Sequence, residues 1–447
     1  MTKDEIPLQT KTPVTLRIES MAFGGRGVGR HDGKVYFING AIEGDLATIA
    51  ITMEGDRYNE GDVIDLPEPS PKRGLSPCPV SDQCGGCQWQ GISYQHQIEW
   101  KKQFVLNSLR RIGKLGESIT VDILPSPQDN GYRNRIFVRS RLTADGQLKV
   151  GYFRGGSRDF IAITSCAIAE QRLNRFIDQL IKTDFKDIAQ SMGLRDEIRF
   201  RFEMQDIPLR SDHEPHILMS IYDSDDQSVS LDPIIKKFRA MPEVAWSGSQ
   251  RELPDAPFFP FENDLGITFH TAAGMFQQIN IPHNHTVRRL VQETVKNYSP
   301  KRVLDVFCGS GNLSLPIARQ VLSVDGVEFS KRAISAAQHN ASIAGITNAQ
   351  YFSGDSEKFL WRAAKQGTQY DLVIADPPRE GMYACLIPLM KIKPKTIIYV
   401  SCDPTTLSRD LSSLCKRDYS VKRFIALDFF PNTYHIESFV ILERNER

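Results

Sequence analysis

The chain has 447 residues, long enough for about three domains, because a single hydrophobic core rarely extends beyond roughly 250 to 300 residues. Hydrophobic residues make up 40% and charged residues 24% of the sequence, which excludes a disordered or collagen-like chain. The 55 basic and 54 acidic residues nearly cancel, so any surface for a polyanion must be local.

The sequence contains no apolar run near the roughly 18 residues needed to span a membrane. Its first residues have neither the basic region nor the apolar region of a signal peptide. We therefore expect a cytoplasmic protein with no membrane partner. Because a reducing compartment disfavours disulfides, the eight cysteines are expected to serve in metal binding, catalysis or packing.

Residues 1–70 predict a small β-barrel. Apolar and polar positions alternate in short runs between residues 12 and 67, and glycine-rich turns separate these runs. The glycine-rich stretch 23–30 predicts a flexible basic loop at the rim of the barrel, with Arg26 and Arg30 as candidate RNA contacts. These residues resemble a TRAM domain, an RNA-binding barrel of the OB type, and small barrels of this type present loops to nucleic acid.

Residues 71–96 hold three cysteines close together, at the end of a proline-rich linker. Cys78, Cys84 and Cys87 follow the spacing C-x5-C-G-G-C, and Cys166 lies far downstream. The paired glycines let backbone N–H groups approach the sulfur atoms, and four thiolates would complete a tetrahedral site. An iron–sulfur cluster and a zinc ion both suit such a site, and a group of unligated buried cysteines is the third alternative.

Residues 97–126 predict a helical segment that packs on the carboxyl-terminal domain, and residues 127–264 predict a strand-rich central domain that binds RNA. Seven basic residues stand against two acidic ones in the window 131–160, with aromatic residues between them. Such a stretch can hold phosphates and stack bases, and Arg133 and Arg135 are its candidate RNA contacts. A strand with one solvated face is the alternative.

Residues 265–447 alternate strand and helix patterns, which predicts a doubly wound, mostly parallel sheet, so the whole chain combines α/β and β domains. The first strand runs into Gly309 and Gly311, a turn expected to open a helix. Glu328 lies 19 residues after Gly309, where a carboxylate can bind two ribose hydroxyls. The turn lacks the third glycine and the lysine of phosphate-binding loops, so a cofactor without phosphates is favoured. Asp355 could accept a hydrogen bond from an adenine amino group.

Six motifs in the same order resemble the RNA uridine-C5 methyltransferase family with an amino-terminal TRAM domain. They are the four cysteines, Phe276-Gln-Gln-Ile-Asn280, the segment from Asp305 to Gly311, Asp376-Pro-Pro-Arg379, Ser401-Cys-Asp-Pro-Thr405 and His435-Ile-Glu437. The resemblance covers nearly the whole chain. It implies a class I methyltransferase domain with a Rossmann-like sheet, a [4Fe–4S] cluster on the cysteines, and methylation of 23S rRNA, with transfer RNA as the alternative substrate. A monomer is expected.

The resemblance also implies S-adenosylmethionine as the methyl donor and a role for each site residue. Gln278 and Asp376 are expected to bind the target uridine, whereas Asn280 and His435 are expected to support the site. The residues expected at the cofactor are Gln278, Asp305, Phe307, Gly309, Gly311, Glu328, Asp355 and Asp376.

The reaction explains why a cysteine and a carboxylate are needed. Uracil C5 is a poor nucleophile, but a thiolate that adds to C6 makes C5 electron-rich enough to attack a sulfonium methyl group. By resemblance Cys402 is this nucleophile, and Glu437 is the base that removes the C5 hydrogen. We expect Asp403 to face away, because an inward carboxylate would raise the pKa of the thiol. A uridine stacked in folded RNA must also be flipped into the site.

Two other functions fit part of the sequence. A non-catalytic RNA-binding or chaperone protein could use the same fold, but the presence of Cys402 and Glu437 opposes it. An amino-methyltransferase could act through Asp376-Pro-Pro-Arg379, although an arginine stands where such enzymes carry an aromatic residue.

Overall fold

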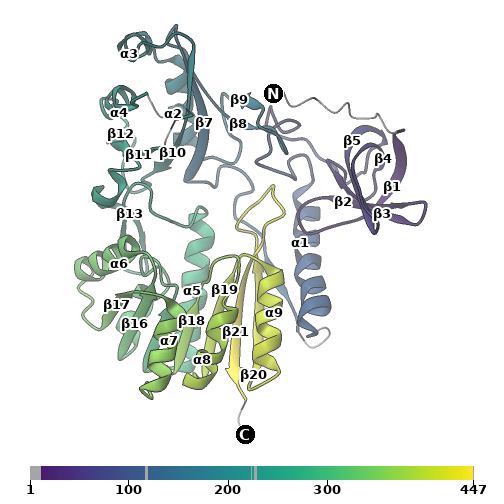
Figure 1. The fold of residues 1–447 in the computed structure, drawn as a ribbon. Helices are drawn as coiled ribbons and strands as arrows, with labels where there is room; N and C mark the ends of the chain where they lie inside the picture. The colour runs from purple at the N-terminus through teal and green to yellow at the C-terminus, as the bar shows by residue number, and fades with distance from the viewer. Residues whose placement is uncertain (1–11, 116–118, 223, 226–228, 446–447) are drawn as a thin grey trace, which may run out of the picture. The chain divides into compact units, whose positions relative to one another are not determined.

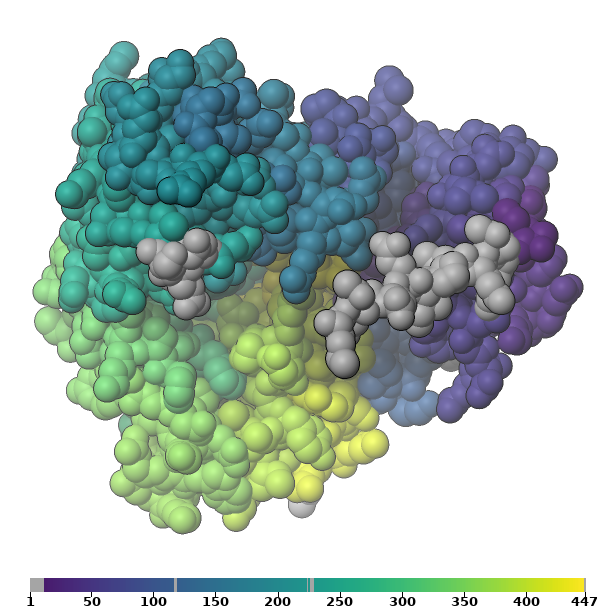
Figure 2. All heavy atoms as spheres, turned by 45° about the horizontal axis from the view of Figure 1, so that its top comes forward, coloured from purple at the N-terminus to yellow at the C-terminus, as the bar shows by residue number. Residues whose placement is uncertain are grey.

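The computed structural model describes residues 12–115, 119–222, 224–225 and 229–445, and the remaining residues are grey in Figures 1 and 2. The chain divides into two compact units. The first comprises Met1–Ser81, Cys87–Phe104 and Asn432–Tyr434, and the second comprises Asp82–Gly86, Val105–Pro431 and His435–Arg447. None of the helices in the described ranges is long and apolar enough to cross a membrane.

The first unit contains a closed barrel of five strands in the order β1-β2-β3-β5-β4, which confirms the expected amino-terminal barrel (Figure 1). Alternate residues such as Ile18, Ile38 and Ile49 fill its interior. At Gly27 a Cβ atom would lie 2.8 Å from the carbonyl oxygen of Ala41, so this close approach requires glycine. The strands are β1 (Val14–Met21), β2 (Gly27–His31), β3 (Lys34–Asn39), β4 (Leu46–Glu54) and β5 (Tyr58–Glu68).

Aromatic residues join the barrel to the start of helix α1 (Tyr94–Ser108) within the first unit. Trp89 is fully buried and its ring lies 5.7 Å from that of Trp100. The indole nitrogen of Trp100 donates a hydrogen bond of 2.7 Å to Glu43. Buried aromatic rings and this hydrogen bond therefore both fix the first turns of the helix on the barrel. A π-helical turn over Leu109–Gly113 follows the helix.

The second unit contains a six-stranded sheet, here called the central sheet, in the order β12-β11-β10-β7-β8-β9. Helix α2 (Gln171–Lys182) packs on β8 and β10, and the ring of Phe238 in α4 (Asp232–Arg239) lies 5.6 Å from that of Phe202 in β10. Both helices therefore cover the same face of the sheet. The strands are β7 (Arg135–Thr143), β8 (Leu148–Phe153), β9 (Phe160–Ala162), β10 (Glu197–Asp206), β11 (Ile217–Tyr222) and β12 (Val244–Ser249), and α3 spans Lys186–Ser191.

An eight-stranded sheet, the C-terminal sheet, has the order β17-β16-β15-β18-β19-β21-β20-β6. The five strands from β17 to β19 in this order are parallel, and β21 is antiparallel to β19 and β20. A separate hairpin consists of β13 (Phe259–Asp264) and β14 (Ile267–Thr271). The sheet strands are β6 (Asp122–Leu124), β15 (Arg302–Val306), β16 (Ser323–Glu328), β17 (Ala349–Ser353), β18 (Leu372–Ala375), β19 (Thr396–Ser401), β20 (Tyr419–Leu427) and β21 (Glu437–Arg444).

Two separate hydrophobic cores show that helices cover both faces of the C-terminal sheet. Helices α7, α8 and α9 pack in one core, and α5 and α6 pack in the other (Figure 1). The helix expected after the glycine turn is a 3-10 helix over Leu315–Gln320, and Pro316 stands in its first turn. The helices are α5 (Ile281–Tyr298), α6 (Lys331–Ile343), α7 (Ser356–Lys365), α8 (Leu386–Ile392) and α9 (Pro404–Cys415).

Candidate active site

The candidate site lies where the parallel strands of the C-terminal sheet end. Asp305 is the penultimate residue of β15, Glu328 ends β16, Asp376 follows β18 and Cys402 follows β19. Because parallel strands end at the same edge of a sheet, the chain order alone brings these polar groups to one edge.

The backbone between β15 and the 3-10 helix is shaped to leave space. Gly309 has φ +53° and no atom within 4 Å of where its Cβ would lie, whereas a Cβ at Gly311 would lie 2.7 Å from Leu315. Phe307 also has a positive φ of 65°, which is uncommon for a residue with a side chain. The open side of this turn is a place where a ligand can approach the backbone.

Asp305 carries the clearest sign of a missing partner. Its carboxyl group is buried, and its Oδ2 atom has no hydrogen-bond partner among the described residues. Burial, together with the nearby carboxylates of Asp376 and Glu328, raises the pKa of this group to about 7, although a hydrogen bond with Ser314 lowers it. A polar ligand group here would satisfy an oxygen atom that the protein leaves without a partner, so the site fits a cofactor with hydrogen-bond donors.

Two more of the acidic residues expected at the cofactor each use an oxygen within the protein. The Oε1 atom of Glu328 accepts a hydrogen bond of 2.8 Å from the backbone N–H of Ser330. Asp355 is the N-cap of α7, and its Oδ1 atom accepts a hydrogen bond of 2.9 Å from the backbone N–H of Lys358. These contacts fix the direction of both carboxylates at the strand ends.

Four charged or nucleophilic side chains interact electrostatically at the ends of β18, β19 and β21. Burial and, to a smaller extent, the carboxylates of Glu437 and Asp376 raise the pKa of the Cys402 thiol to about 12, although the guanidinium of Arg379 lowers it. Burial also raises the pKa of Glu437 well above its usual value and that of Asp376 to about 7. The arrangement places a thiol, two carboxyl groups with raised pKa values, and one cation together.

Asp403, next to the thiol, caps the following helix. Its Oδ1 atom accepts hydrogen bonds from the backbone N–H groups of Thr405 at 2.8 Å and Thr406 at 2.9 Å, at the start of α9. Its charge still raises the pKa of Cys402, but it is the smallest of the contributions from the groups around the thiol.

The segment 275–280 is held from the central sheet. The guanidinium of Arg135 donates a hydrogen bond of 2.8 Å to the carbonyl of Met275 and lies 5.6 Å from the ring of Phe276, which is 70% exposed. The side chain of Asn134 donates to the carbonyl of Gln278 at 3.3 Å. Arg135, expected to contact RNA, therefore also positions this segment.

Asn280, expected to support the site, makes contacts with backbone and side chains around it. It is the N-cap of α5, and its amide group donates to Ser126 at 3.2 Å and to the carbonyl of Phe429 at 3.1 Å. The ring of His435 lies 5.8 Å from that of Phe430.

The two arginines expected at the barrel rim form ion pairs with neighbouring acids. Arg26 lies 2.7 Å from Glu60, and Arg30 pairs with Glu19. In the second unit, the guanidinium of Arg133 lies 6.0 Å from the ring of Tyr132. The structure thus places these arginines against protein partners.

The four cysteines are divided between the two units. Cys78 and Cys87 belong to the first, and Cys84 and Cys166 belong to the second. In the second unit the backbone N–H of Gly86 donates to the sulfur of Cys84 at 3.4 Å, and both Cys84 and Cys166 raise the pKa of the Tyr152 hydroxyl after burial. Within the described ranges, no group of three or more His, Cys, Asp or Glu side chains is arranged to hold a metal ion.

A buried network that the sequence pattern did not indicate anchors the glycine turn. Arg288 in α5 is 1% exposed and donates hydrogen bonds of 3.2 Å to the carbonyl of Asn312 and 2.6 Å to Glu262. Its guanidinium also lies 3.8 Å from the ring of Phe269. Arg379 belongs to one of the family motifs, but the sequence assigned it no role of its own, whereas in the structure its charge lowers the pKa of the Cys402 thiol.

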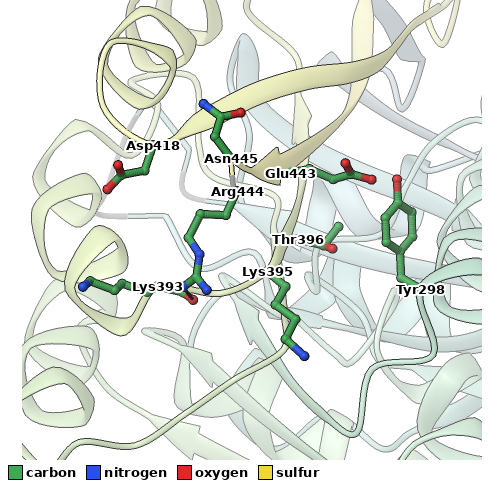
Figure 3. Close-up of a pocket in the computed structure, with 8 residues that line it drawn as sticks. All are labelled: Tyr298, Lys393, Lys395, Thr396, Asp418, Glu443, Arg444 and Asn445. Carbon is green, nitrogen blue, oxygen red and sulfur yellow. Dashed lines mark hydrogen bonds between the residues drawn. The ribbon is translucent and has the colours of Figure 1, made fainter. Parts of the chain in front are cut away.

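A hollow of about 770 Å³ lies at the opposite end of the same strands (Figure 3). Thr396 begins β19 there and Arg444 ends β21. Burial, together with a hydrogen bond that Tyr298 donates to Glu443, raises the pKa of this tyrosine to about 12. Glu443 also forms an ion pair with Lys422 at 3.2 Å. Glu443 in this hollow is therefore paired within the protein, unlike the carboxyl oxygen of Asp305.

Comparison with known proteins agrees with this geometry. Residues 262–445 match the family described as tRNA (Uracil-5-)-methyltransferase. An RNA methyltransferase of Halalkalibacterium halodurans is 30% identical, covering 99% of each chain, and one of Nostoc is 29% identical, covering 97% of each. In fold, the chain resembles the tRNA (uracil-54, C5)-methyltransferase of Pyrococcus abyssi, solved with S-adenosyl-L-homocysteine, with a TM-score of 0.67, 22% identity and coverage of 96% and 100%.

Proposed function

The chain belongs to the RNA uracil-C5 methyltransferase family and is an S-adenosylmethionine-dependent RNA methyltransferase, and on this premise we propose that it methylates C5 of a uridine through a covalent adduct with Cys402. The observation that carries the proposal is the grouping of Cys402, Glu437, Asp376 and Arg379 at the strand ends. No amino-methyltransferase needs a thiol beside a buried base, so this grouping favours the pyrimidine reaction.

Cys402 starts the proposed reaction. The Cys402 thiol gives its proton to solvent, the resulting thiolate adds to C6 of uracil, the C5–C6 double bond opens, and the electron pair passes to C5 and O4. The positive charge of Arg379 favours the thiolate. Asp376, whose pKa is raised to about 7, can keep a proton at neutral pH and donate a hydrogen bond to the ring oxygen as it gains charge, and the Gln278 amide orients the ring.

Glu437 completes the proposed reaction. S-adenosylmethionine, when bound, supplies an electrophilic methyl group to C5, and Asp305, the glycine turn, Phe307, Glu328 and Asp355 are proposed to bind it. Glu437 then takes the proton from C5, the C5–C6 double bond re-forms, and the Cys402 sulfur leaves as thiolate. A buried carboxylate with a raised pKa is a strong base once ionised, which suits this step.

RNA containing 5-fluorouridine tests the adduct, because fluorine cannot be removed as a proton. The wild-type protein is expected to form a complex with this RNA that survives denaturing electrophoresis, and Cys402→Ala is expected to form none. Cys415→Ala is a matched control, because Cys415 lies at the far end of α9. A complex formed equally by Cys402→Ala would reject the assignment of the nucleophile.

The first RNA to test is 23S rRNA, because the barrel and the cysteine spacing resemble ribosomal members of the family. Transfer RNA is the second candidate, favoured by the description of the matching family and by the substrate of the Pyrococcus abyssi enzyme. Mass spectrometry of 5-methyluridine in both RNAs, from cells with and without the protein, distinguishes them. Loss of the modification from transfer RNA alone would reject the ribosomal assignment.

The proposal extends to the other parts of the chain. Residues 1–70 are proposed as a TRAM barrel and 127–264 as a central RNA-binding domain, joined by the cysteine segment 71–96 and the helical segment 97–126 to the methyltransferase domain 265–447. Arg26, Arg30, Arg133 and Arg135 are proposed to contact RNA. A monomer is proposed, and light scattering of the full chain measures the oligomeric state.

The four cysteines are proposed to hold a [4Fe–4S] cluster with no step in the reaction. The spacing of Cys78, Cys84 and Cys87 and the Gly86 N–H donated to Cys84 support this proposal. Iron and sulfide in purified protein are expected near about four each per chain. Zinc without iron or sulfide would overturn the cluster and leave the methyl transfer proposal intact.

A further inference from the structure

Four arginines form two cross-strand pairs on the face of the central sheet that α2 and α4 do not cover. Arg139 of β7 lies opposite Arg201 of β10, and Arg141 lies opposite Arg199. Residues of the alternate positions, such as Val138 and Phe202, are buried on the helical side. Like charges directly opposite each other destabilise a sheet, so this arrangement needs a compensating partner.

The described residues compensate these charges only in part. Glu197 is shared, since it lies 3.3 Å from Arg141 and 2.7 Å from Arg199. Within the described ranges, Arg139 and Arg201 contact aromatic rings and no carboxylate. The guanidinium of Arg139 lies 4.7 Å from the centre of the Phe153 ring, and that of Arg201 lies 5.0 Å from the centre of the Tyr222 ring. Stacking on a ring leaves the N–H edge of a guanidinium available to an anion.

The same residues line a hollow of about 480 Å³. Phe153 and Phe160 face each other across β8 and β9, and the guanidinium of Arg141 lies 4.6 Å from the Phe160 ring. Five arginines and one aspartate are among its lining residues. The volume is in the range of a small-ligand site, which at roughly 300 to 1,000 Å³ can admit a nucleotide.

We propose that this arginine hollow, defined by Arg139, Arg141, Arg199, Arg201, Phe153 and Phe160, binds the phosphate backbone and one unstacked base of the RNA substrate away from the methylated uridine. This inference rests on the proposed function and names a second place where the same RNA is held. Planar guanidiniums match phosphates with two hydrogen bonds each, and flat rings stack bases without regard to sequence. An acidic protein segment could also neutralise the arginines, but it would have no base to stack on the rings of Phe153 and Phe160.

The test is the double substitution Arg199→Gln with Arg201→Gln, compared with Arg175→Gln. Arg175 lies in α2, on the covered side of the sheet, and pairs with Asp212 at 2.9 Å, so its loss removes a charge from the same domain but not from the hollow. RNA affinity is measured at several salt concentrations. Loss of two phosphate contacts should lower the slope of log affinity against log salt by about 1.4 for single-stranded RNA.

In steady-state methylation the double variant should raise the KM for RNA about ten-fold or more, with kcat within about two-fold of wild type, because the reacting groups are untouched. Phe153→Leu should weaken RNA binding while leaving the salt slope unchanged, which keeps the proposal testable if the double variant folds poorly. Binding of S-adenosylmethionine, measured separately, reports folding and should not change.

The outcomes separate this inference from the proposed function. If wild-type protein methylates RNA and the double variant matches Arg175→Gln in KM and salt slope, the arginine hollow is rejected and the methyltransferase stands. If wild-type protein methylates no uridine but the salt slope falls as expected, the hollow stands and the proposed function is rejected.

Discussion

Two regions of the second unit concentrate charge of one sign and resolve the repulsion in different ways. At the edge of the C-terminal sheet, Asp305 and Glu437 are buried and Asp376 is half-buried, and each has a raised pKa. On the open face of the central sheet, arginines oppose each other in pairs. A carboxyl group can relieve repulsion by holding a proton, whereas a guanidinium stays charged at any physiological pH.

Because of this difference, the two regions suit different functions. Protons held by buried carboxyl groups can be moved during a reaction, so the acidic edge suits chemistry. Fixed charges on an exposed face can be neutralised only by counterions or by a bound polyanion, so the arginine face suits binding. Substitutions that change charge in each region should therefore affect different measurements.

Glu437→Gln should give the largest effect, because it removes the proposed base while keeping the shape of the side chain. Turnover is expected to fall by roughly 10²- to 10⁴-fold. Since C5 of the methylated adduct then keeps its hydrogen, the covalent complex should accumulate on ordinary RNA, which denaturing electrophoresis detects.

Glu443→Gln is the control, because Glu443 lies near the other end of β21, in the hollow of Figure 3. It is expected to turn over at the wild-type rate. Fast turnover by Glu437→Gln would remove this carboxylate from the mechanism and, with it, the contrast between an acidic edge for chemistry and a basic face for binding.

Asp305→Asn should have an intermediate effect, which is a change in the free energy of unfolding that depends on pH. The carboxyl pKa is about 7 in the folded protein, above its ordinary value, so the unfolded chain ionises first as pH rises. Wild-type stability is therefore fully present below the ordinary carboxyl pKa and is lost as pH rises towards 7. The variant should gain at most about 4 kcal/mol over wild type at pH 8 and almost nothing near pH 4.

Urea unfolding without S-adenosylmethionine measures this difference. Asp371→Asn is the control of opposite sign, because Asp371 accepts hydrogen bonds from the backbone N–H groups of Lys301 at 2.9 Å and Arg302 at 3.0 Å, which lower its pKa. Its substitution should reduce stability at pH 8. An Asp305→Asn protein no more stable than wild type at pH 8 would show that burial does not strain this carboxyl group.

The acidic edge could be predicted from the sequence better than the arginine face, for a physical reason. Asp305, Glu328 and Asp376 each follow a recognisable apolar strand, and parallel pairing brings strand ends together whatever the details of packing. The basic window 131–160 contains Arg139 and Arg141, but their partners lie about 60 residues later and become neighbours only through the register of β7 on β10.

Local pattern also failed where a residue acts through buried contacts. Arginine is a residue type that is usually exposed, yet Arg288 is fully buried and holds Asn312 beside the glycine turn. The turn and a helix after it were predicted from the glycines, but the 3-10 type of that helix was not. Long-range contacts decide such cases.

The smallest effect is expected on the stability of the arginine face, and it has the opposite sign to the effect on binding. Removing like charges that face each other should leave the Arg199→Gln, Arg201→Gln protein as stable as wild type or more stable, by less than about 1 kcal/mol, since these side chains are exposed. Thermal unfolding at low salt measures the gain, which should vanish at about 0.5 M salt because ions screen exposed charges. Glu197→Gln should instead lower the midpoint, because Glu197 neutralises two of the arginines. A large loss of stability in the double variant would mean that these arginines hold the sheet together, and the face would then be structural rather than kept for RNA.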